Sequence, residues 1–231
     1  MSAQSTVFLF GQKYTDYIYD IGSELKLGTR NHAQAFRTQL GGIYNIKRFG
    51  IAKTNYVCKT FGETDAVIIQ EISRSRRTSI TRYTNEEDLT LEVTPCHWAH
   101  IAYIDDTAAL PNIDSFNVPV TYDFCTANDR TLYEDLINKS EFIFDSRENK
   151  HLYSKVDTDK RIVLHDPYGS EVLCKGKVSH KQEITPIKKI AVNGAGDLFA
   201  AIFIHLCLEK DFETAADYTT HLTKDFMLRN L

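Results

Sequence analysis

The 231-residue sequence predicts an α/β fold with a mainly parallel sheet. Short apolar runs, rich in β-branched and aromatic residues, recur at 100–104, 118–122, 142–144 and 161–164. A helical pattern over 132–137 separates the second run from the third. Alternation of strand, helix and strand is typical of crossover units, and crossover units build parallel sheets.

Composition and charge agree with a globular domain of this class. Apolar residues make up 42% and charged residues 25% of the chain, and its length favours one large domain. A net charge of -4 gives no general attraction to nucleic acid or to anionic membranes. The five cysteines are dispersed without a CxxC pair, which argues against disulfides and zinc. No segment has the length of a membrane span, and the N-terminus lacks a signal-peptide pattern, so we expect a cytoplasmic protein.

The N-terminal half predicts a first strand, a short helix and a hairpin. Residues 7–10 read as a buried strand that ends at Gly11. Residues 43–49 have near-helical apolar spacing after a Gly-Gly pair, and Gly50 is a plausible C-cap. Runs at 66–69 and 79–83 read as strands joined by a polar linker.

The C-terminal half predicts two strands and two or three helices. Residues 171–174 and 188–192 read as strands on either side of a polar stretch. A long apolar helix follows Asp197, and 212–231 reads as one or two amphipathic helices.

Some predicted strands do not fit the alternation of strand, helix and strand. They lie at about 16–40 and 66–83, and they can form a small sheet over an active site. We therefore expect a single domain over 1–231, with lid strands contributed by these two segments.

The segment 193–197, Asn-Gly-Ala-Gly-Asp, is the strongest functional signal. Two glycines allow a tight turn with uncovered N–H groups, at a helix start that favours an anion. Asp197 beside such an anion can accept the proton of an attacking hydroxyl. The alternative is a well-packed turn in which Asp197 caps the helix, and the spacing alone supports both interpretations equally.

The sequence resembles the ribokinase family, also called PfkB-type carbohydrate kinases, at five places in the family's order. The resembling residues are Gly11 with Asp16; Gly41-Gly42 with Asn45; Asp145-Ser146-Arg147-Glu148 in place of Asn-x-x-Glu; the Gly-rich turn at 164–170; and Gly194-Ala195-Gly196-Asp197 with Phe199. The resemblance implies a three-layer core with a mainly parallel sheet and a small β lid.

The resemblance also implies roles and cofactors. The expected cofactors are ATP and Mg²⁺, and in many such kinases the lid pairs two subunits, so a homodimer is plausible. Arg77 or Arg82 in the lid can reach the substrate or remain solvated. The implied roles are base for Asp197; anion hole for Gly194, Ala195 and Gly196; acceptor contacts for Asp16, Gly41, Gly42 and Asn45; nucleotide contacts for Asn193, His165 and Gly169; and magnesium contacts for Glu148 and Asp145.

Several positions depart from the family pattern. An Asp that commonly helps hold a monovalent cation is Ala191 here, which argues against potassium activation. Asp145 replaces the usual Asn, so it can bind the metal directly or weaken nucleotide binding. The chain is short, with only residues 53–65 between the Gly-Gly helix segment and the lid strand.

The predicted activity is phosphorylation of a hydroxyl on a sugar or sugar derivative. The stretch 122–125, Tyr-Asp-Phe-Cys, with Tyr133 further on, resembles the fructosamine-type kinases. One alternative is a nucleoside kinase of the same fold, with Tyr14, Tyr17 and Phe36 available to stack on a base. Another is a non-catalytic binding protein of this fold, suggested by the short chain and the departures.

Overall fold

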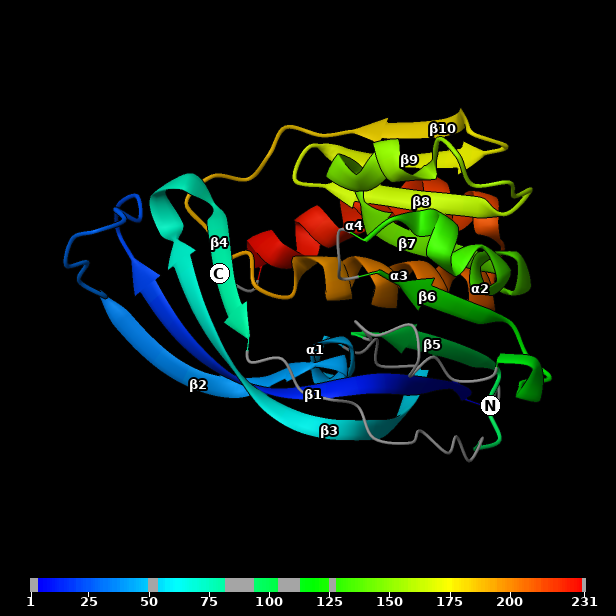
Figure 1. Ribbon diagram of the computed structural model, residues 1–231, viewed down its shortest axis with the longest axis horizontal. Helices are drawn as coiled ribbons and strands as arrows, with labels where there is room; N and C mark the ends of the chain where they lie inside the picture. Colours follow the sequence, from blue (N-terminus) through cyan, green and yellow to red (C-terminus); the bar gives the residue numbers. More distant parts are fainter. Residues whose placement is uncertain (1–3, 50–53, 82–93, 104–112, 125–127, 230–231) are drawn as a thin grey trace.

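The computed structural model describes residues 4–49, 54–81, 94–103, 113–124 and 128–229. Ten strands form one sheet, and helices pack on both of its faces (Figure 1). The strands are β1 (Ser5–Ile21), β2 (Ala35–Gly42), β3 (Thr54–Glu71), β4 (Arg76–Thr81), β5 (Trp98–Ala102), β6 (Val120–Asp123), β7 (Phe142–Ser146), β8 (Arg161–Asp166), β9 (Gly169–Cys174) and β10 (Lys177–Glu183). The α-helices are α1 (Ile43–Arg48), α2 (Glu134–Lys139), α3 (Ala195–Glu209) and α4 (Phe212–Arg229), and the 3₁₀ segments are η1 (Ile72–Arg74), η3 (Ile113–Ser115), η4 (Arg130–Tyr133) and η5 (Arg147–Tyr153).

The centre of the sheet is parallel, as predicted. Strands β3, β1, β5, β6, β7 and β8 are neighbours in that order and run parallel. The β9 and β10 strands then continue the sheet in antiparallel fashion. The expected α/β class with a mainly parallel sheet is therefore confirmed.

The prediction of a strand over 188–192 is wrong. This segment has no regular structure, and Lys189 has a φ of 61°, which a strand does not accept. The sheet edge is instead completed by β10, in the stretch that the sequence marked only as polar. Because β10 lies at an edge, it needs few apolar residues to pair, so its pattern was weak.

Alternating residues of β1 build two cores, one on each face of the sheet. Phe8 and Phe10 join the cluster under α2 and the neighbouring 3₁₀ segments. Val7 and Leu9 join the cluster under α1, α3 and α4. The α3 helix is apolar and buried over 198–204. The sequence predicted a long apolar helix after Asp197. The result is the expected three-layer core.

Two long strands extend beyond the core into a smaller sheet, which we call the lid. The lid consists of β2, β4, residues 13–21 of β1 and residues 63–71 of β3, and it projects from one end of the molecule (Figure 1). The predicted hairpin is confirmed, since β3 pairs antiparallel with β4. Arg82 and Tyr83 lie outside the described residues, as does Gly50.

The β3 strand is longer than predicted. Residues 54–65 were expected to form only a connection, but 54–60 pair parallel with the core part of β1. The stretch 54–60, Thr-Asn-Tyr-Val-Cys-Lys-Thr, mixes polar and apolar residues without a long apolar run, so its strand signal was weak.

Gly11 lies where β1 leaves the core for the lid. The β5 partner of β1 ends at Ala102, and β2 takes over from Lys13 after a register shift. A Cβ atom at Gly11 would lie 1.9 Å from the Ala102 carbonyl oxygen. Only glycine fits this crossing.

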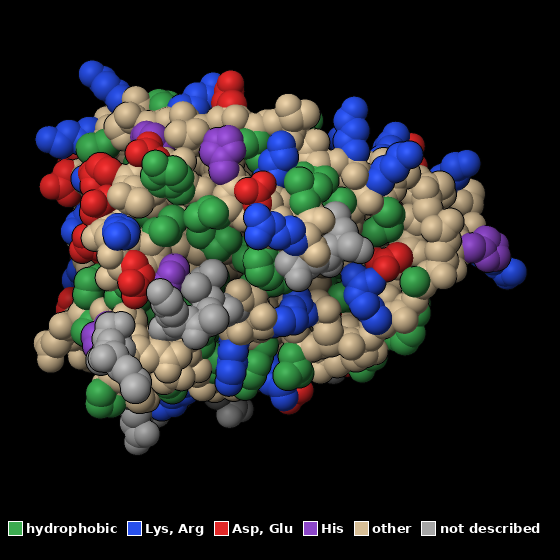
Figure 2. Space-filling view, turned by 180° about the vertical axis from the view of Figure 1, so that it is seen from behind, with side chains coloured by type: hydrophobic (Ala, Val, Ile, Leu, Met, Phe, Trp, Pro, Cys, Tyr) green, Lys and Arg blue, Asp and Glu red, His purple; other side chains and the backbone are tan. Residues whose placement is uncertain are grey.

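The surface has no strong single-sign patch on the face shown in Figure 2, where basic and acidic side chains are interspersed. None of the described helices is both long and apolar enough to cross a membrane.

Candidate active site

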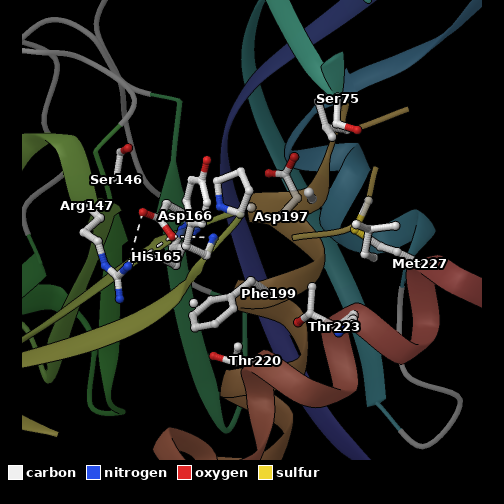
Figure 3. Close-up of a pocket in the computed structure, with 18 of the residues that line it drawn as sticks. Ser75, Ser146, Arg147, His165, Asp166, Asp197, Phe199, Thr220, Thr223 and Met227 are labelled. Atoms are coloured by element: carbon white, nitrogen blue, oxygen red, sulfur yellow. Dashed lines mark hydrogen bonds and ion pairs between the residues drawn. The ribbon is translucent and has the colours of Figure 1, made fainter. Parts of the chain in front are cut away.

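A cavity of about 950 Å³ lies at the carboxyl ends of the parallel strands. Its wall includes residues at or just after the ends of four strands: Tyr103 after β5, Asp123 on β6, Ser146 on β7 and His165 on β8. In open α/β sheets, ligands bind at this edge because the connecting loops diverge there. The first turn of α3 forms another part of the wall, with Asp197 facing the cavity (Figure 3).

The glycine turn before α3 has the geometry that the sequence predicted. Gly194 is the N-cap with a φ of 82°, and a Cβ there would lie 2.7 Å from the Phe49 ring. The Ala195 amide donates to the Val192 carbonyl, and the Leu198 amide donates to the Gly194 carbonyl. The amides of Gly196 and Asp197 remain as first-turn donors for an anion.

Asp197 is a buried carboxylate, 5% exposed. The Tyr103 hydroxyl donates to both of its oxygens, at 2.7 Å to Oδ1 and 2.8 Å to Oδ2. Burial raises the pKa of Asp197 to about 6, against the opposing effects of Tyr103, Arg77, Asn45 and Arg48. A carboxylate with a pKa near the working pH suits general-base catalysis.

Two of the predicted acceptor residues, Asp16 and Asn45, lie together with Asn193 beside Asp197. We call Asp16, Asn45 and Asn193 the polar cluster. The Asn45 side chain hydrogen-bonds with Asp197 and accepts from Arg48 Nη2 at 2.8 Å. Asn193 Nδ2 donates to Asp16 Oδ2 at 3.2 Å. Burial raises the pKa of Asp16, although Asn193 and other neighbours oppose this.

The Gly-Gly pair lies directly against this cluster. A Cβ atom at Gly41 would lie 2.3 Å from the Asp16 carboxylate oxygens. Gly42 has a φ of 63°, and a Cβ there would lie 2.1 Å from the Gln12 carbonyl oxygen. Both glycines are therefore required by close approach.

The lid contacts the segment before the glycine turn. Arg77 Nη1 on β4 donates to Asn193 Oδ1 at 2.8 Å, and the Ile190 amide donates to Ser75 Oγ at 3.3 Å. Asn193, which was expected on the nucleotide side, thus links Arg77 to Asp16.

The other two predicted nucleotide residues, His165 and Gly169, line the cavity. The His165 ring stacks on Phe199 at 4.7 Å between centroids, and burial lowers its pKa to about 4, so the ring is neutral. Gly169 has a φ of 144°, and a Cβ there would lie 1.9 Å from the Gln182 carbonyl oxygen.

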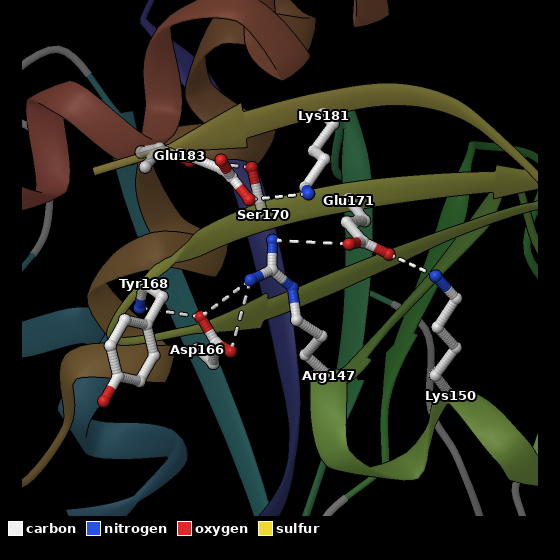
Figure 4. A network of polar contacts seen from close by, with 9 residues as sticks. Arg147, Lys150, Asp166, Tyr168, Ser170, Glu171, Lys181 and Glu183 are labelled. Atoms are coloured by element: carbon white, nitrogen blue, oxygen red, sulfur yellow. Dashed lines mark hydrogen bonds and ion pairs between the residues drawn. The ribbon is translucent and has the colours of Figure 1, made fainter. Parts of the chain in front are cut away.

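An ion network holds the turn between β8 and β9 that carries Gly169 (Figure 4). Arg147 Nη1 lies 3.4 Å from Asp166, and Arg147 Nη2 lies 3.6 Å from Glu171. Asp166 Oδ1 also accepts from the Tyr168 amide at 2.7 Å. Arg147, the first residue of η5, therefore holds the turn between β8 and β9 in place.

Apolar side chains form another part of the cavity wall. They are Ile184, Ile187, Ile190 and Met227, and Lys224 on α4 also lines the cavity. Such a surface suits a planar, weakly polar group.

The two predicted magnesium residues lie in different environments. Glu148 is exposed and lines the cavity. Asp145 is fully buried, and Arg130 donates to its Oδ2 at 2.9 Å from Nε and lies 2.8 Å away at Nη2. Tyr153, Asn149 and the Ser146 amide donate to the same carboxylate at 2.6, 2.8 and 2.7 Å.

Asp145 therefore does not fit direct metal binding, because both oxygens already accept from protein donors. The described residues hold no group of three His, Cys, Asp or Glu that could bind a metal by themselves.

Sequence reasoning missed two residues of this site, Tyr103 and Arg48, and it considered Asp123 only within the stretch 122–125. Arg48 lies three residues after Asn45 on α1, and that helical spacing was a usable signal. Burial, with the nearby Asp197 and Asp145 charges, raises the pKa of Asp123 to about 8. Tyr103 was assigned to the interior of a strand over 100–104, whereas β5 ends at Ala102.

No family model and no curated protein matches the sequence. A nucleoside kinase from Methanocaldococcus jannaschii, described as an archaeal member of the ribokinase family, is 15% identical with a TM-score of 0.69, covering 96% of this chain and 91% of that one. Thermotoga maritima ribokinase is 14% identical with a TM-score of 0.68, covering 95% and 91%.

A third similar structure is Arabidopsis thaliana ribokinase complexed with ribose and ATP. It is 14% identical with a TM-score of 0.59, covering 95% of this chain and 91% of that chain. These likenesses show that the chain has the ribokinase fold.

Proposed function

We propose that this chain, which has the ribokinase fold, is an ATP-dependent kinase that phosphorylates a hydroxyl of a sugar or sugar derivative. The observation that carries the proposal is the placement of Asp197. This buried carboxylate lies in the first turn of α3, beside the Gly196 amide and at the wall of a 950 Å³ cavity.

In the proposed reaction, Asp197 accepts the proton of the acceptor hydroxyl while the hydroxyl oxygen attacks the γ-phosphorus of ATP. The bond from that phosphorus to the bridging oxygen breaks, and ADP leaves. The amides of Gly196 and Asp197, on the Gly194–Ala195–Gly196 turn, stabilise charge on the transferring group. Asp16, Asn45 and the Gly41–Gly42 pair bind and orient the acceptor hydroxyls.

ATP occupies the cavity in this proposal. Its base packs on the apolar wall residues Ile184, Ile187 and Met227, and its phosphates point toward Gly196. His165 and Gly169 form the wall beside the nucleotide. Support comes from the same fold in the Arabidopsis ribokinase, which was solved with ribose and ATP.

Magnesium would supply charge neutralisation at the ATP phosphates when bound. Mg²⁺ keeps several of its waters in such sites, and Glu148 can orient one of them from the cavity wall. Asp145 takes no part, since it pairs with Arg130. Ala191 offers no side-chain oxygen, so we propose no potassium requirement.

A nucleoside acceptor is the second candidate, because the M. jannaschii protein of this fold is a nucleoside kinase. Of the three aromatic residues considered for base stacking, Tyr14 lies near the site, with its ring 5.6 Å from that of Tyr103. Tyr17 and Phe36 lie on the opposite face of the lid, since Asp16 faces the polar cluster and successive strand residues alternate. This placement favours the sugar-type acceptor.

The fructosamine-type acceptor is a special case within the proposal. Asp123 and Phe124 line the cavity, where they can meet a substituent on the sugar. Cys125 lies outside the described residues.

We also propose that the lid face opposite the polar cluster pairs two copies of the chain. This outer face carries exposed apolar side chains that cross-strand pairing brings together. They are Tyr19, Phe36, Leu40, Val67 and Ile80.

The test of the activity is ATP turnover with a panel of sugars, fructosamines and nucleosides. The Asp197→Asn variant should lose roughly 100-fold or more in kcat, because it removes the base. Asp211→Asn is the matched control. Asp211 caps α4 by accepting from the Thr214 amide at 2.7 Å, and it does not line the cavity.

Two results would contradict the proposal. Absence of ATP and Mg²⁺ binding by calorimetry would remove the nucleotide site. ATP binding with no turnover on any acceptor, and no effect of Asp197→Asn, would favour the non-catalytic binding protein.

A further inference from the structure

The Tyr103 side chain contacts the Asp197 carboxylate directly. Its hydroxyl lies 2.7 Å from Oδ1 and 2.8 Å from Oδ2, so it sits in front of the carboxylate between the two oxygens. A carboxylate has about four lone-pair positions, and one phenol leaves others for an acceptor hydroxyl. A donor in this place also restricts rotation of the carboxylate.

The backbone of Tyr103 supports a dedicated role. Its φ of 61° lies in the left-handed region, which is rare for a bulky residue. Such conformations persist where the surrounding structure imposes them, often at functional sites. Here the conformation directs the ring from the end of β5 toward the start of α3, and the edge contact with Tyr14 supports the ring.

The other groups around Asp197 do not replace this contact. Arg77 on β4 and Arg48 on α1 favour the charged carboxylate through space, and Asn45 on α1 hydrogen-bonds with it. On β6, the pKa of Asp123 is raised by burial and by the nearby charge of Asp197, because two nearby carboxylates repel each other when both are charged. The Tyr103 hydroxyl donates a hydrogen bond to both carboxylate oxygens.

We propose that Tyr103 is a positioning residue for Asp197: its hydroxyl holds the buried carboxylate in its charged form and in a fixed orientation toward the cavity. Hydrogen bonds to a charged group are short and strong, so this one offsets part of the desolvation of Asp197. The catalytic consequence of this inference rests on the proposed kinase function.

The test compares Tyr103→Phe with the wild type. Phenylalanine keeps the ring and its contact with Tyr14 but removes the donor. The carboxyl carbon of Asp197 is followed by ¹³C NMR against pH, and its signal is assigned by its loss in Asp197→Asn. We expect the pKa of Asp197 to rise by roughly one unit in Tyr103→Phe, because a donor to the charged form is lost.

The matched control is Tyr153→Phe, which removes a phenol donor from another Asp. Tyr153 donates to Asp145 at 2.6 Å, so its loss should leave the titration of Asp197 unchanged. A second variant keeps the hydrogen bond: fluorotyrosine at position 103 is a stronger donor, and it should lower the pKa of Asp197.

Activity gives the second readout. The acid limb of kcat/KM against pH should move upward in Tyr103→Phe by the same amount as the NMR titration, with the rate recovering at high pH. A purely structural role would lower the rate at every pH. An unchanged Asp197 titration in Tyr103→Phe would overturn the inference. A shifted titration in a protein without ATP turnover would retain it and reject the proposed kinase function.

Discussion

At the scale of single residues, the burial of Asp197 suits its proposed role as a base but lowers the stability of the fold at high pH. Its pKa rises from 3.8 to about 6 on folding, mainly because burial disfavours the charged form. The folded protein therefore binds this proton more tightly than the unfolded chain does. Protonation of Asp197 therefore raises the free energy of unfolding of the wild type as the pH falls from about 6 toward 3.8. Above about 6 this contribution is lost.

We predict that Asp197→Asn stabilises the protein at pH 8 while it lowers kcat. The gain should be at most about 3 kcal/mol, since each pKa unit corresponds to about 1.4 kcal/mol. Urea unfolding at pH 8 and pH 4 measures it, and the gain should shrink at the lower pH. Asp211→Asn, at an exposed cap, should show no such gain. Lower stability of Asp197→Asn at pH 8 would contradict the prediction.

The glycine turn before α3 was predictable from the sequence because local geometry decides it. Gly194 at the N-cap has the positive φ of a tight turn, and Gly196 and Asp197 follow in the first turn of the helix. Asp145 shows the opposite case. Its partner Arg130 lies 15 positions away and reaches it only through the packing of η4 against η5.

At the scale of elements, Arg130 ties η4, β7 and η5 together. Its side chain is fully buried against Asp145. Its guanidinium carbon lies 4.5 Å from the Phe124 ring centroid and 5.9 Å from that of Tyr153. This arrangement fixes the end of β7, and with it the start of η5, where Glu148 and Arg147 lie.

We predict that Arg130→Met destabilises the protein by about 3–5 kcal/mol, because it leaves the Asp145 carboxylate buried without its partner. Urea unfolding at pH 7 measures the loss. The control is Lys139→Met, which removes an exposed pair with Asp114 and should cost about 1 kcal/mol or less. A loss for Arg130→Met no larger than that of the control would show that the buried pair contributes little.

Element prediction followed the strength of the apolar pattern. The strands β5, β6, β7 and β8 are buried on both faces, so their continuous apolar runs identified them. The β10 strand is largely polar and the first part of β3 mixes polar and apolar residues, so their pairing partners, more than their composition, make them strands.

At the scale of the whole molecule, the lid presents an outer face that the chain itself leaves exposed. Phe36 is 55% and Ile80 60% exposed, and the ladder from β2 through β1 and β3 to β4 places both on one face. Exposed apolar surface of this kind commonly marks an interface.

We predict that the protein sediments as a dimer in analytical ultracentrifugation. The double variant Phe36→Asp/Ile80→Asp should sediment as a monomer, because two buried charges in each copy would oppose pairing. Leu27→Asp is the control, since Leu27 is 88% exposed in the turn between β1 and β2. Sedimentation of the wild type as a monomer at micromolar concentration would contradict the prediction.

The amino-acid order alone was enough for the class of fold, the parallel centre of the sheet and the glycine turn with Asp197. Each depends on properties local to a few residues: burial of a strand, a turn with positive φ, or an amphipathic period. The tertiary structure decided the partners. Tyr103 hydrogen-bonds with Asp197, which is 94 positions away, and Asn193 hydrogen-bonds with Asp16, which is 177 positions away. Strand pairings that no short stretch encodes bring these residues together. The residues of the proposed chemistry were thus visible in the sequence, while their protonation and orientation follow from packing.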